Sequence, residues 1–268
     1  MKKYLVIGNP IEHSQSPLIH NYWMRKHKLT DNIYEKKKVE KKDLESIVNQ
    51  IRNNELKGVN ITVPFKKEII PFLDRLDDIA QNTQSVNTLC KVKKEVWGYN
   101  TDATGFDDSL TGDNIDYSDK DIFILGAGGV TSSIIYNFIF NANKIYITNR
   151  TKEKAEKLKK RDLTGKVEVI DWGQKPKTCD FVINTTSVGL TEDQNLSLDF
   201  KEYKNNKNTL FYDIIYNPKE TNFLKDARLR GNKAMNGKMM FLHQARSAFQ
   251  IWTGIAPEID DEVIKLLD

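Results

Sequence analysis

The stretch Asp121-Ile122-Phe123-Ile124-Leu125-Gly126-Ala127-Gly128-Gly129 decides the fold of this 268-residue chain. Its first five residues are largely apolar and predict a short strand buried on both faces, as in a parallel sheet. Glycines follow at once, and from Val130 to Ile139 apolar residues recur at helical spacing. A glycine turn lets the backbone approach a pyrophosphate, and a helix N-terminus offers it free N–H groups. We therefore expect a Rossmann-like, dinucleotide-binding unit here, although Thr131 stands where the G-x-G-x-x-G fingerprint has its third glycine.

The end of the next expected strand, Lys144–Thr148, distinguishes between the two nicotinamide cofactors. An NAD site usually has Asp or Glu here, which accepts hydrogen bonds from the ribose 2′-OH. This chain has Arg150 instead, with Lys152 and Lys154 close by. A guanidinium can hold a 2′-phosphate with its planar fork, so NADP is favoured over the alternative of an exposed basic loop. The cofactor-binding residues expected in this unit are Gly126, Ala127, Gly128, Gly129, Val130, Asn149, Arg150, Thr151 and Lys154.

Strands and helices alternate along the rest of the chain. Before the glycine turn we expect a buried strand at Lys3–Gly8, a helix opened by Ser16-Pro17 with Ser16 as its N-cap, an exposed strand at Ile33–Val39, a helix at Asp43–Asn53 and a strand at Val59–Val63. After it we expect a charged helix at Lys152–Lys160, strands at Val167–Ile170, Phe181–Asn184 and Leu210–Asp213, and an apolar helix at Met239–Thr253. This alternation indicates βαβ units and parallel sheets, and hence an α/β fold.

Composition excludes several classes of protein. The net charge is +4, from 41 Lys+Arg and 37 Asp+Glu, and the lysines are spread along the chain, so no nucleic-acid partner is expected. No apolar run reaches the roughly 18 residues that span a membrane, and the apolar run at the N-terminus is too short for a signal peptide. Cys90 and Cys179 have no metal-type spacing, so we expect free thiols, no metal and a cytoplasmic location.

Several short motifs outside the nucleotide unit carry polar side chains in a fixed order. They are Ser14-Gln15-Ser16-Pro17, Asn60-Ile61-Thr62-Val63-Pro64-Phe65-Lys66, Val86-Asn87-Thr88, Asn100-Thr101-Asp102 and His243-Gln244-Ala245. Together with the glycine turn and Asn149-Arg150-Thr151, they closely resemble the shikimate dehydrogenase family. The resemblance implies reversible NADPH-dependent reduction of 3-dehydroshikimate to shikimate, a step of chorismate and aromatic amino-acid biosynthesis.

Lys66 and Asp102 match the catalytic pair of that family. Ketone reduction needs a proton for the oxygen on which negative charge develops, and an ammonium group can stabilise that charge and donate the proton. A neighbouring carboxylate can orient the lysine and hold a substrate hydroxyl. The alternatives are a solvated Lys66 and an Asp102 that only caps a helix starting near Ala103. Which group transfers the proton stays open.

The resemblance also implies the remaining site residues. Ser14 and Ser16 would bind the substrate carboxylate, although Ser16 could be only a helix cap. Hydroxyls of the substrate would meet Asn60, Thr62, Asn87 and Gln244, and Tyr216 matches a substrate-contacting tyrosine. Ile214 and Gly237 would meet the nicotinamide end of NADP. We therefore expect three parts: a substrate domain at residues 1–101, a Rossmann-like NADP-binding domain at 102–236, and a helical segment at 237–268 that returns to the substrate domain.

Some positions depart from the family pattern. Gln84-Ser85 replaces Gly-Ala before Val86, Phe65 replaces a common histidine, and Asn184–Leu190 lacks the usual Pro-Ala and Met. Alternatives are a quinate/shikimate dehydrogenase that uses NAD, and a non-catalytic NADP-binding regulator on the same fold. Ser16 and Arg150 argue against the first, and Lys66 with Asp102 argues against the second. We expect an enzyme acting on a small molecule, as a monomer or homodimer, with no nucleic-acid or membrane partner.

Overall fold

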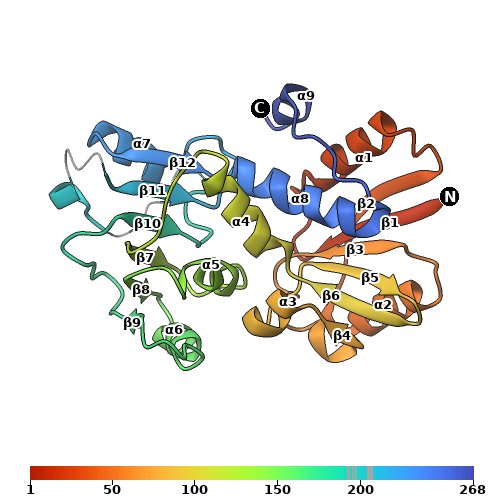
Figure 1. The fold of residues 1–268 in the computed structure, drawn as a ribbon, viewed down its shortest axis with the longest axis horizontal. Helices are drawn as coiled ribbons and strands as arrows, with labels where there is room; N and C mark the ends of the chain where they lie inside the picture. The colour runs from red at the N-terminus through yellow and green to blue at the C-terminus, as the bar shows by residue number, and fades with distance from the viewer. Residues whose placement is uncertain (192–193, 195, 197, 204–207) are drawn as a thin grey trace. The chain divides into compact units, whose positions relative to one another are not determined.

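A computed structural model divides the chain into two compact units (Figure 1). The first comprises Met1–Asp108 and Leu242–Asp268, and the second comprises Ser109–Phe241. Each unit contains a six-stranded sheet, which confirms the expected α/β fold. The domain ranges expected from the sequence stay a prediction. The structure describes residues 1–191, 194, 196, 198–203 and 208–268.

The sheet of the first unit is mixed rather than parallel throughout. Its strands are β1 (Lys2–Gly8), β2 (Asn32–Lys38), β3 (Gly58–Ile61), β4 (Arg75–Leu76), β5 (Thr88–Val92) and β6 (Glu95–Tyr99), in the order β2-β1-β3-β5-β6-β4. The pairs β1–β2, β1–β3 and β4–β6 are parallel, whereas β3–β5 and β5–β6 are antiparallel. The expectation of a parallel sheet is therefore wrong for this part of the unit, where a hairpin follows Asn87.

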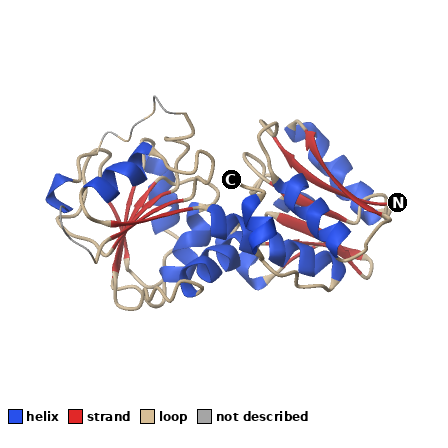
Figure 2. Cartoon of the chain, turned by 90° about the horizontal axis from the view of Figure 1, so that it is seen from above, coloured by secondary structure: helices blue, strands red, loops and turns tan. Residues whose placement is uncertain are grey.

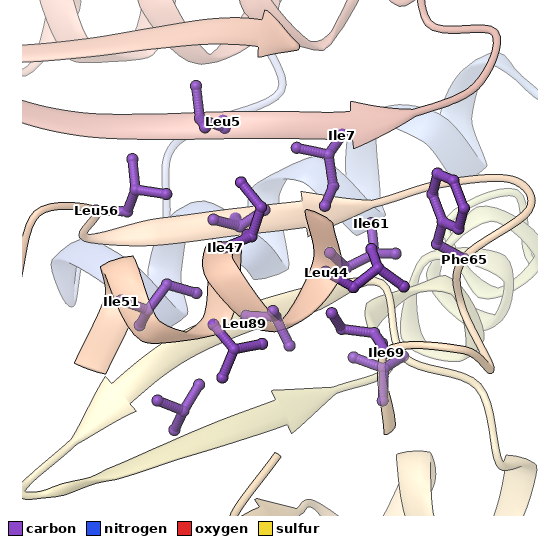
Figure 3. Close-up of a cluster of buried hydrophobic side chains, with 14 of the residues drawn as sticks. Leu5, Ile7, Leu44, Ile47, Ile51, Leu56, Ile61, Phe65, Ile69 and Leu89 are labelled. Carbon is purple, nitrogen blue, oxygen red and sulfur yellow. The ribbon is translucent and has the colours of Figure 1, made fainter. Parts of the chain in front are cut away.

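Helix α2 (Leu44–Arg52) closes one face of this sheet (Figure 3). Leu44, Ile47 and Ile51 recur at helical spacing and are at most 1% exposed. They pack in one cluster with residues of β1, β3 and β5, among them Leu5, Ile7, Ile61 and Leu89. Phe65 and Ile69, from the segment after β3, belong to the same cluster.

The other helices of the first unit include α1 (Ser16–Lys26) and α8 (Lys238–Thr253). Trp252, near the end of α8, donates a hydrogen bond from Nε1 to the carbonyl of Leu89 at 3.0 Å. A Cβ at Gly58 would lie 2.3 Å from Trp252 Nε1, so this close approach requires glycine on β3. Helix α4 (Thr101–Thr111) begins in this unit and ends in the second. The shorter helices are α3 (Asp78–Thr83), α9 (Asp261–Lys265), η1 (Lys41–Asp43) and η2 (Ile70–Phe72).

One local expectation is wrong in this unit, and a second fails at one residue. Ser16 is the first residue of α1, and the N-cap position is occupied by Gln15, which makes no side-chain capping bond. The Ser16 hydroxyl is therefore not used to cap the helix. The strand expected to be exposed, β2, carries one side chain that is only 1% exposed, Tyr34.

The sheet of the second unit is wholly parallel within the described residues. Its strands are β7 (Asp121–Leu125), β8 (Lys144–Thr148), β9 (Val167–Val169), β10 (Phe181–Asn184), β11 (Leu210–Asp213) and β12 (Lys233–Asn236), in the order β12-β11-β10-β7-β8-β9. Counted from β7, this is the 6-5-4-1-2-3 order of a Rossmann fold, whose direction reverses between β7 and β10. Ligands of such sheets bind where the strand order reverses, at the carboxyl ends of the strands.

Helices lie on both faces of this sheet, as Figure 2 shows. They are α5 (Thr131–Phe138), α6 (Lys152–Lys159), α7 (Asn222–Leu229) and η3 (Lys201–Tyr203). The ring of Phe211 on β11 lies 5.4 Å from that of Phe223 in α7. On β10 the ring of Phe181 lies 5.8 Å from that of Phe138 in α5. Among the helices described, none combines the length and apolarity needed to cross a membrane.

Candidate active site

Lys66 is fixed by the packing of its neighbours. Phe65 and Ile69 are buried in the cluster below α2, and the Lys66 carbonyl accepts a hydrogen bond from Val86 N at 2.9 Å. Its ammonium group lies 2.6 Å from Asp102 Oδ2, and the two side chains are only 12% and 9% exposed. The structure therefore brings the two expected catalytic residues together as a largely buried ion pair.

Asp102 does not cap its helix. The side chain of Asn100 takes that role in α4, because its Oδ1 accepts hydrogen bonds from Asp102 N at 3.1 Å and Ala103 N at 3.3 Å. The alternative of a capping aspartate is therefore wrong. The carboxylate of Asp102 binds Lys66 through Oδ2 and accepts a hydrogen bond from Asn87 Nδ2, at 3.0 Å, through Oδ1.

Asn87 is the centre of the polar site. Its Nδ2 lies 2.9 Å from Thr101 Oγ1 and 3.4 Å from Gln244 Oε1, besides Asp102. Its Oδ1 accepts a hydrogen bond from Thr101 N at 2.8 Å. The side chain is only 3% exposed, so its amide is fixed by these partners. Gln244 therefore belongs to the same hydrogen-bonded group as Lys66 and Asp102.

Asn60 joins this group from β3. Its Nδ2 donates to the carbonyl of Asn87 and to Thr88 Oγ1, both at 3.0 Å, and its Oδ1 accepts from Tyr34 Oη at 2.6 Å. The sequence did not single out Tyr34, Thr88 or Thr101. The two threonines stand inside the quoted motifs and could have been found there.

The two serines lie where the loop after β1 leads into α1: Ser14 is in the loop and Ser16 is the first residue of the helix. Ser14 Oγ lies 3.4 Å from the backbone N of Ser16, so the two expected carboxylate ligands are neighbours. Thr62 follows β3 and donates from its backbone to the carbonyl of Ile7 at 2.9 Å. A Cβ at Gly8 would lie 2.5 Å from Thr62 Cγ2, so only glycine lets these segments pass so closely.

Tyr216 belongs to the second unit. Its ring stacks on that of Phe241 with the centroids 4.5 Å apart.

The glycine turn after β7 fits a bound dinucleotide. Gly126 has φ +111°, and a Cβ there would lie 2.6 Å from Thr185 Oγ1, so the protein itself requires this glycine. At Gly128 a Cβ would meet no protein atom within 4 Å. The second glycine thus has no packing reason, and the open space beside it lies where a pyrophosphate would approach the start of α5. Ala127, Gly129 and Val130 complete the turn.

The loop after β8 carries the basic residues. Asn149 Oδ1 accepts a hydrogen bond from Ala127 N at 3.1 Å, and its Nδ2 donates to the Thr151 carbonyl at 2.7 Å. Asn149 therefore ties this loop to the glycine turn. Lys152 Nζ is paired with Asp171 Oδ1 at 2.6 Å, whereas Arg150 and Lys154 are exposed and make no ion pair with the described residues.

A buried carboxylate organises the carboxyl ends of β10 and β11. Asp213 accepts hydrogen bonds from Thr221 Oγ1 at 2.7 Å, Asn184 Nδ2 at 3.1 Å and Ile215 N at 3.1 Å. Burial raises the pKa of Asp213 to about 6, against the effect of these donors. Next to it, a Cβ at Gly237 would lie 2.0 Å from the Ile214 carbonyl oxygen. The two backbone segments expected at the nicotinamide end are therefore in contact.

No cluster of histidine, cysteine or acidic side chains suited to a metal ion occurs among the residues that the structure describes. The second unit combines a Rossmann sheet with an open glycine turn and with Arg150, which has no ion pair among the described residues. This combination is typical of enzymes that bind a nicotinamide nucleotide. The other unit supplies a lysine–carboxylate pair surrounded by amides and hydroxyls, which suits proton transfer to a polar substrate. Fold and site together define an oxidoreductase of the NADP-dependent class.

Comparisons with known proteins identify the family. Residues 6–89 match the shikimate dehydrogenase substrate-binding domain, and residues 109–224 match the shikimate/quinate 5-dehydrogenase family. The chain belongs to the shikimate dehydrogenase family.

Individual relatives agree over the full length. The shikimate dehydrogenase (NADP(+)) of Pelagibacter ubique is 48% identical over 270 residues, covering 100% of this chain and 99% of the relative. A shikimate dehydrogenase solved in complex with NADP+ has a TM-score of 0.91 and 32% identity, covering 100% of this chain and 94% of the other. The enzyme of Listeria monocytogenes, solved with shikimate and NAD, has a TM-score of 0.90 and 29% identity, covering 100% and 96%.

Proposed function

We propose that this chain catalyses the reversible NADPH-dependent reduction of 3-dehydroshikimate to shikimate, in chorismate and aromatic amino-acid biosynthesis. The observation that carries the proposal is the ion pair of Lys66 and Asp102, 2.6 Å apart and held by the buried amide of Asn87. This pair stands in a chain whose full-length relatives are shikimate dehydrogenases that carry NADP(+) in their names.

Lys66 and Asp102 divide the proton chemistry. NADPH, when bound, supplies the hydride that reduces the ketone carbon. The ammonium group of Lys66 stabilises the negative charge that develops on the ketone oxygen and delivers a proton to it. Asp102 keeps the ammonium group in place through one oxygen. Its other oxygen is held by Asn87, so the carboxylate cannot rotate away when the substrate binds.

The remaining polar residues select the substrate. Ser14 and Ser16 bind its carboxylate, and Asn60, Thr62, Asn87, Gln244 and Tyr216 bind its hydroxyls. Buried amides such as those of Asn60 and Asn87, 7% and 3% exposed, disfavour a ligand that leaves them without partners. This gives a physical reason for discrimination among ring compounds that differ in one hydroxyl.

The cofactor is held by the second unit. Gly126, Ala127, Gly128, Gly129 and Val130 receive the pyrophosphate of NADP, and Arg150 with Lys154 receives the 2′-phosphate. Asn149 and Thr151 shape this loop, and the backbone at Ile214 and Gly237 meets the nicotinamide. We place the enzyme in the cytoplasm as a monomer or homodimer. Its two cysteines, Cys90 and Cys179, are free and buried, which agrees with a reducing compartment.

The replacement Lys66→Ala tests the proposal. Wild-type protein should reduce NADP+ with shikimate as the hydride donor. The reaction should be much slower when quinate replaces shikimate or when NAD+ replaces NADP+. In the variant kcat should fall at least about 100-fold, because the proton donor is gone. The matched control is Lys67→Ala, which removes the neighbouring exposed lysine and should leave kcat within about twofold. Comparable turnover of quinate with NAD+, or an unaffected Lys66→Ala, would contradict the proposal.

A further inference from the structure

Tyr34 is a buried phenol in an otherwise polar edge strand. Of the seven residues of β2 it alone is buried, at 1% exposed, while three lysines follow it closely. Because β2 pairs only with β1, one side of its backbone has no strand partner. The side chain of Asn21 in α1 fills that side: its Oδ1 accepts from Tyr34 N at 2.9 Å and its Nδ2 donates to the Tyr34 carbonyl at 2.8 Å. The backbone of Tyr34 is therefore fixed.

The ring of Tyr34 is fixed as well. His20 stacks on it with the centroids 4.3 Å apart and the planes 8° from parallel. Trp252 lies on the same cluster, its ring 6.0 Å from that of Tyr34. His20 is fully buried, so the stack has no solvent on its far side. The hydroxyl is therefore carried on a ring that cannot swing away.

That hydroxyl contacts a residue of the proposed substrate site. It donates to Asn60 Oδ1 at 2.6 Å. Burial raises the pKa of Tyr34 well above its usual value. Tyr34 is on β2 and Asn60 on β3, so the phenol fixes a residue that is expected to touch the substrate from a strand outside the expected site.

From Asn60 the contacts continue to the catalytic pair. With its Oδ1 occupied by Tyr34, the amide turns its Nδ2 toward the Asn87 carbonyl at 3.0 Å. The Asn87 side chain in turn lies 3.0 Å from Asp102 Oδ1. Every step joins groups that are less than 10% exposed, where a hydrogen bond is shielded from water.

We propose that Tyr34 is a positioning residue of the substrate site: its hydroxyl fixes the amide of Asn60 and, through Asn60 and Asn87, holds the carboxylate of Asp102. This inference rests on the proposed function and assigns a role to a residue that does not itself touch the substrate. It predicts that loss of one oxygen atom, remote from the reacting atoms, weakens shikimate binding while NADP+ binding is unchanged.

The experiment compares Tyr34→Phe with wild type in steady-state NADP+ reduction by shikimate. The variant keeps the ring stack and removes only the hydroxyl. We expect the KM for shikimate to rise at least fivefold and kcat to fall, with the KM for NADP+ within twofold. The matched control is Tyr4→Phe, which removes the hydroxyl of another buried tyrosine, on β1, and should change neither constant.

A double replacement tests the route of the effect. If Tyr34 acts through Asn60, then Tyr34→Phe should have little further effect in an Asn60→Ala background. Wild-type-like kinetics of Tyr34→Phe, a parallel rise in both KM values, or full additivity with Asn60→Ala would each overturn the inference. These outcomes are distinct from a failure of the proposed function, in which the wild type itself would not oxidise shikimate with NADP+.

Discussion

Gly126 and Gly128 of the same turn require glycine for different reasons, and substitutions at the two positions can separate a role in stability from a role in cofactor binding. Gly126 has φ +111° and lies against Thr185, whereas the space around a Cβ at Gly128 is free of protein atoms. In Gly128→Ala we therefore expect an unchanged free energy of unfolding and a KM for NADP+ raised about tenfold or more, since the methyl group occupies the position of the pyrophosphate. Steady-state kinetics and urea unfolding of the same preparations measure both quantities.

Gly126→Ala serves as the contrasting variant. A side chain there is strained by the positive φ and clashes with Thr185 Oγ1, so the protein should lose about 1–3 kcal/mol of stability. If Gly128→Ala were destabilised to the same extent, or kept a normal KM for NADP+, the second glycine would have no role in binding the cofactor.

At the scale of elements, α1 and α8 enclose a histidine that cannot ionise easily. His20 of α1 is fully buried between Tyr34 and Phe249, and neither ring nitrogen has a hydrogen-bond partner among the described residues. Burial lowers its pKa to about 3. The unfolded chain, with a pKa near 6.5, then binds the proton first as the pH falls. His20 therefore destabilises the fold progressively below about pH 6.5.

The variant His20→Phe keeps an aromatic ring in the cluster and cannot titrate. Between pH 7.5 and pH 5, the wild type should lose about 2 kcal/mol more stability than the variant, as follows from the two pKa values. Urea unfolding at a series of pH values measures the difference. Curves that remain parallel over this range would show that His20 does not control the acid sensitivity.

The elements also show where local sequence patterns are sufficient. Strand β7 is buried on both faces after its first residue, so its apolar run ends where the strand ends. The expected bounds of β7 and β8 are both confirmed. The β5–β6 hairpin was missed because its turn contains Lys93 at φ +57°, a conformation usually signalled by Asn or Gly. The contact of Tyr34 with Asn60 was also missed. Tyr34 on β2 reaches Asn60 on β3 across the strand between them, β1, and this strand order is not encoded in any local pattern.

At the scale of the whole molecule, most of the proposed substrate residues belong to one unit and the proposed cofactor residues to the other. Lys66, Asp102, Asn87 and Asn60 all belong to the first unit, and the glycine turn with the loop after β8 belongs to the second. The motifs predicted both groups, because each is anchored at the end of a strand. The net charge of +4 gave no such information. A ligand can use the basic side chains that are not already paired with acidic ones, and only the structure shows which these are.

Arg150 and Lys152 illustrate the difference and give the final prediction. Arg150 is exposed without an ion pair among the described residues, whereas Lys152 is held by Asp171 at 2.6 Å. In Arg150→Ala we expect the KM for NADP+ to rise about tenfold or more, because the 2′-phosphate loses its guanidinium. The KM for shikimate should stay within about twofold, since Arg150 is not among the proposed substrate ligands. Lys152→Ala is the matched control and should change the KM for NADP+ far less. Kinetics with NAD+, which lacks the phosphate, complete the test: an equal rise in KM for NAD+ and NADP+ in Arg150→Ala would exclude a contact with the 2′-phosphate.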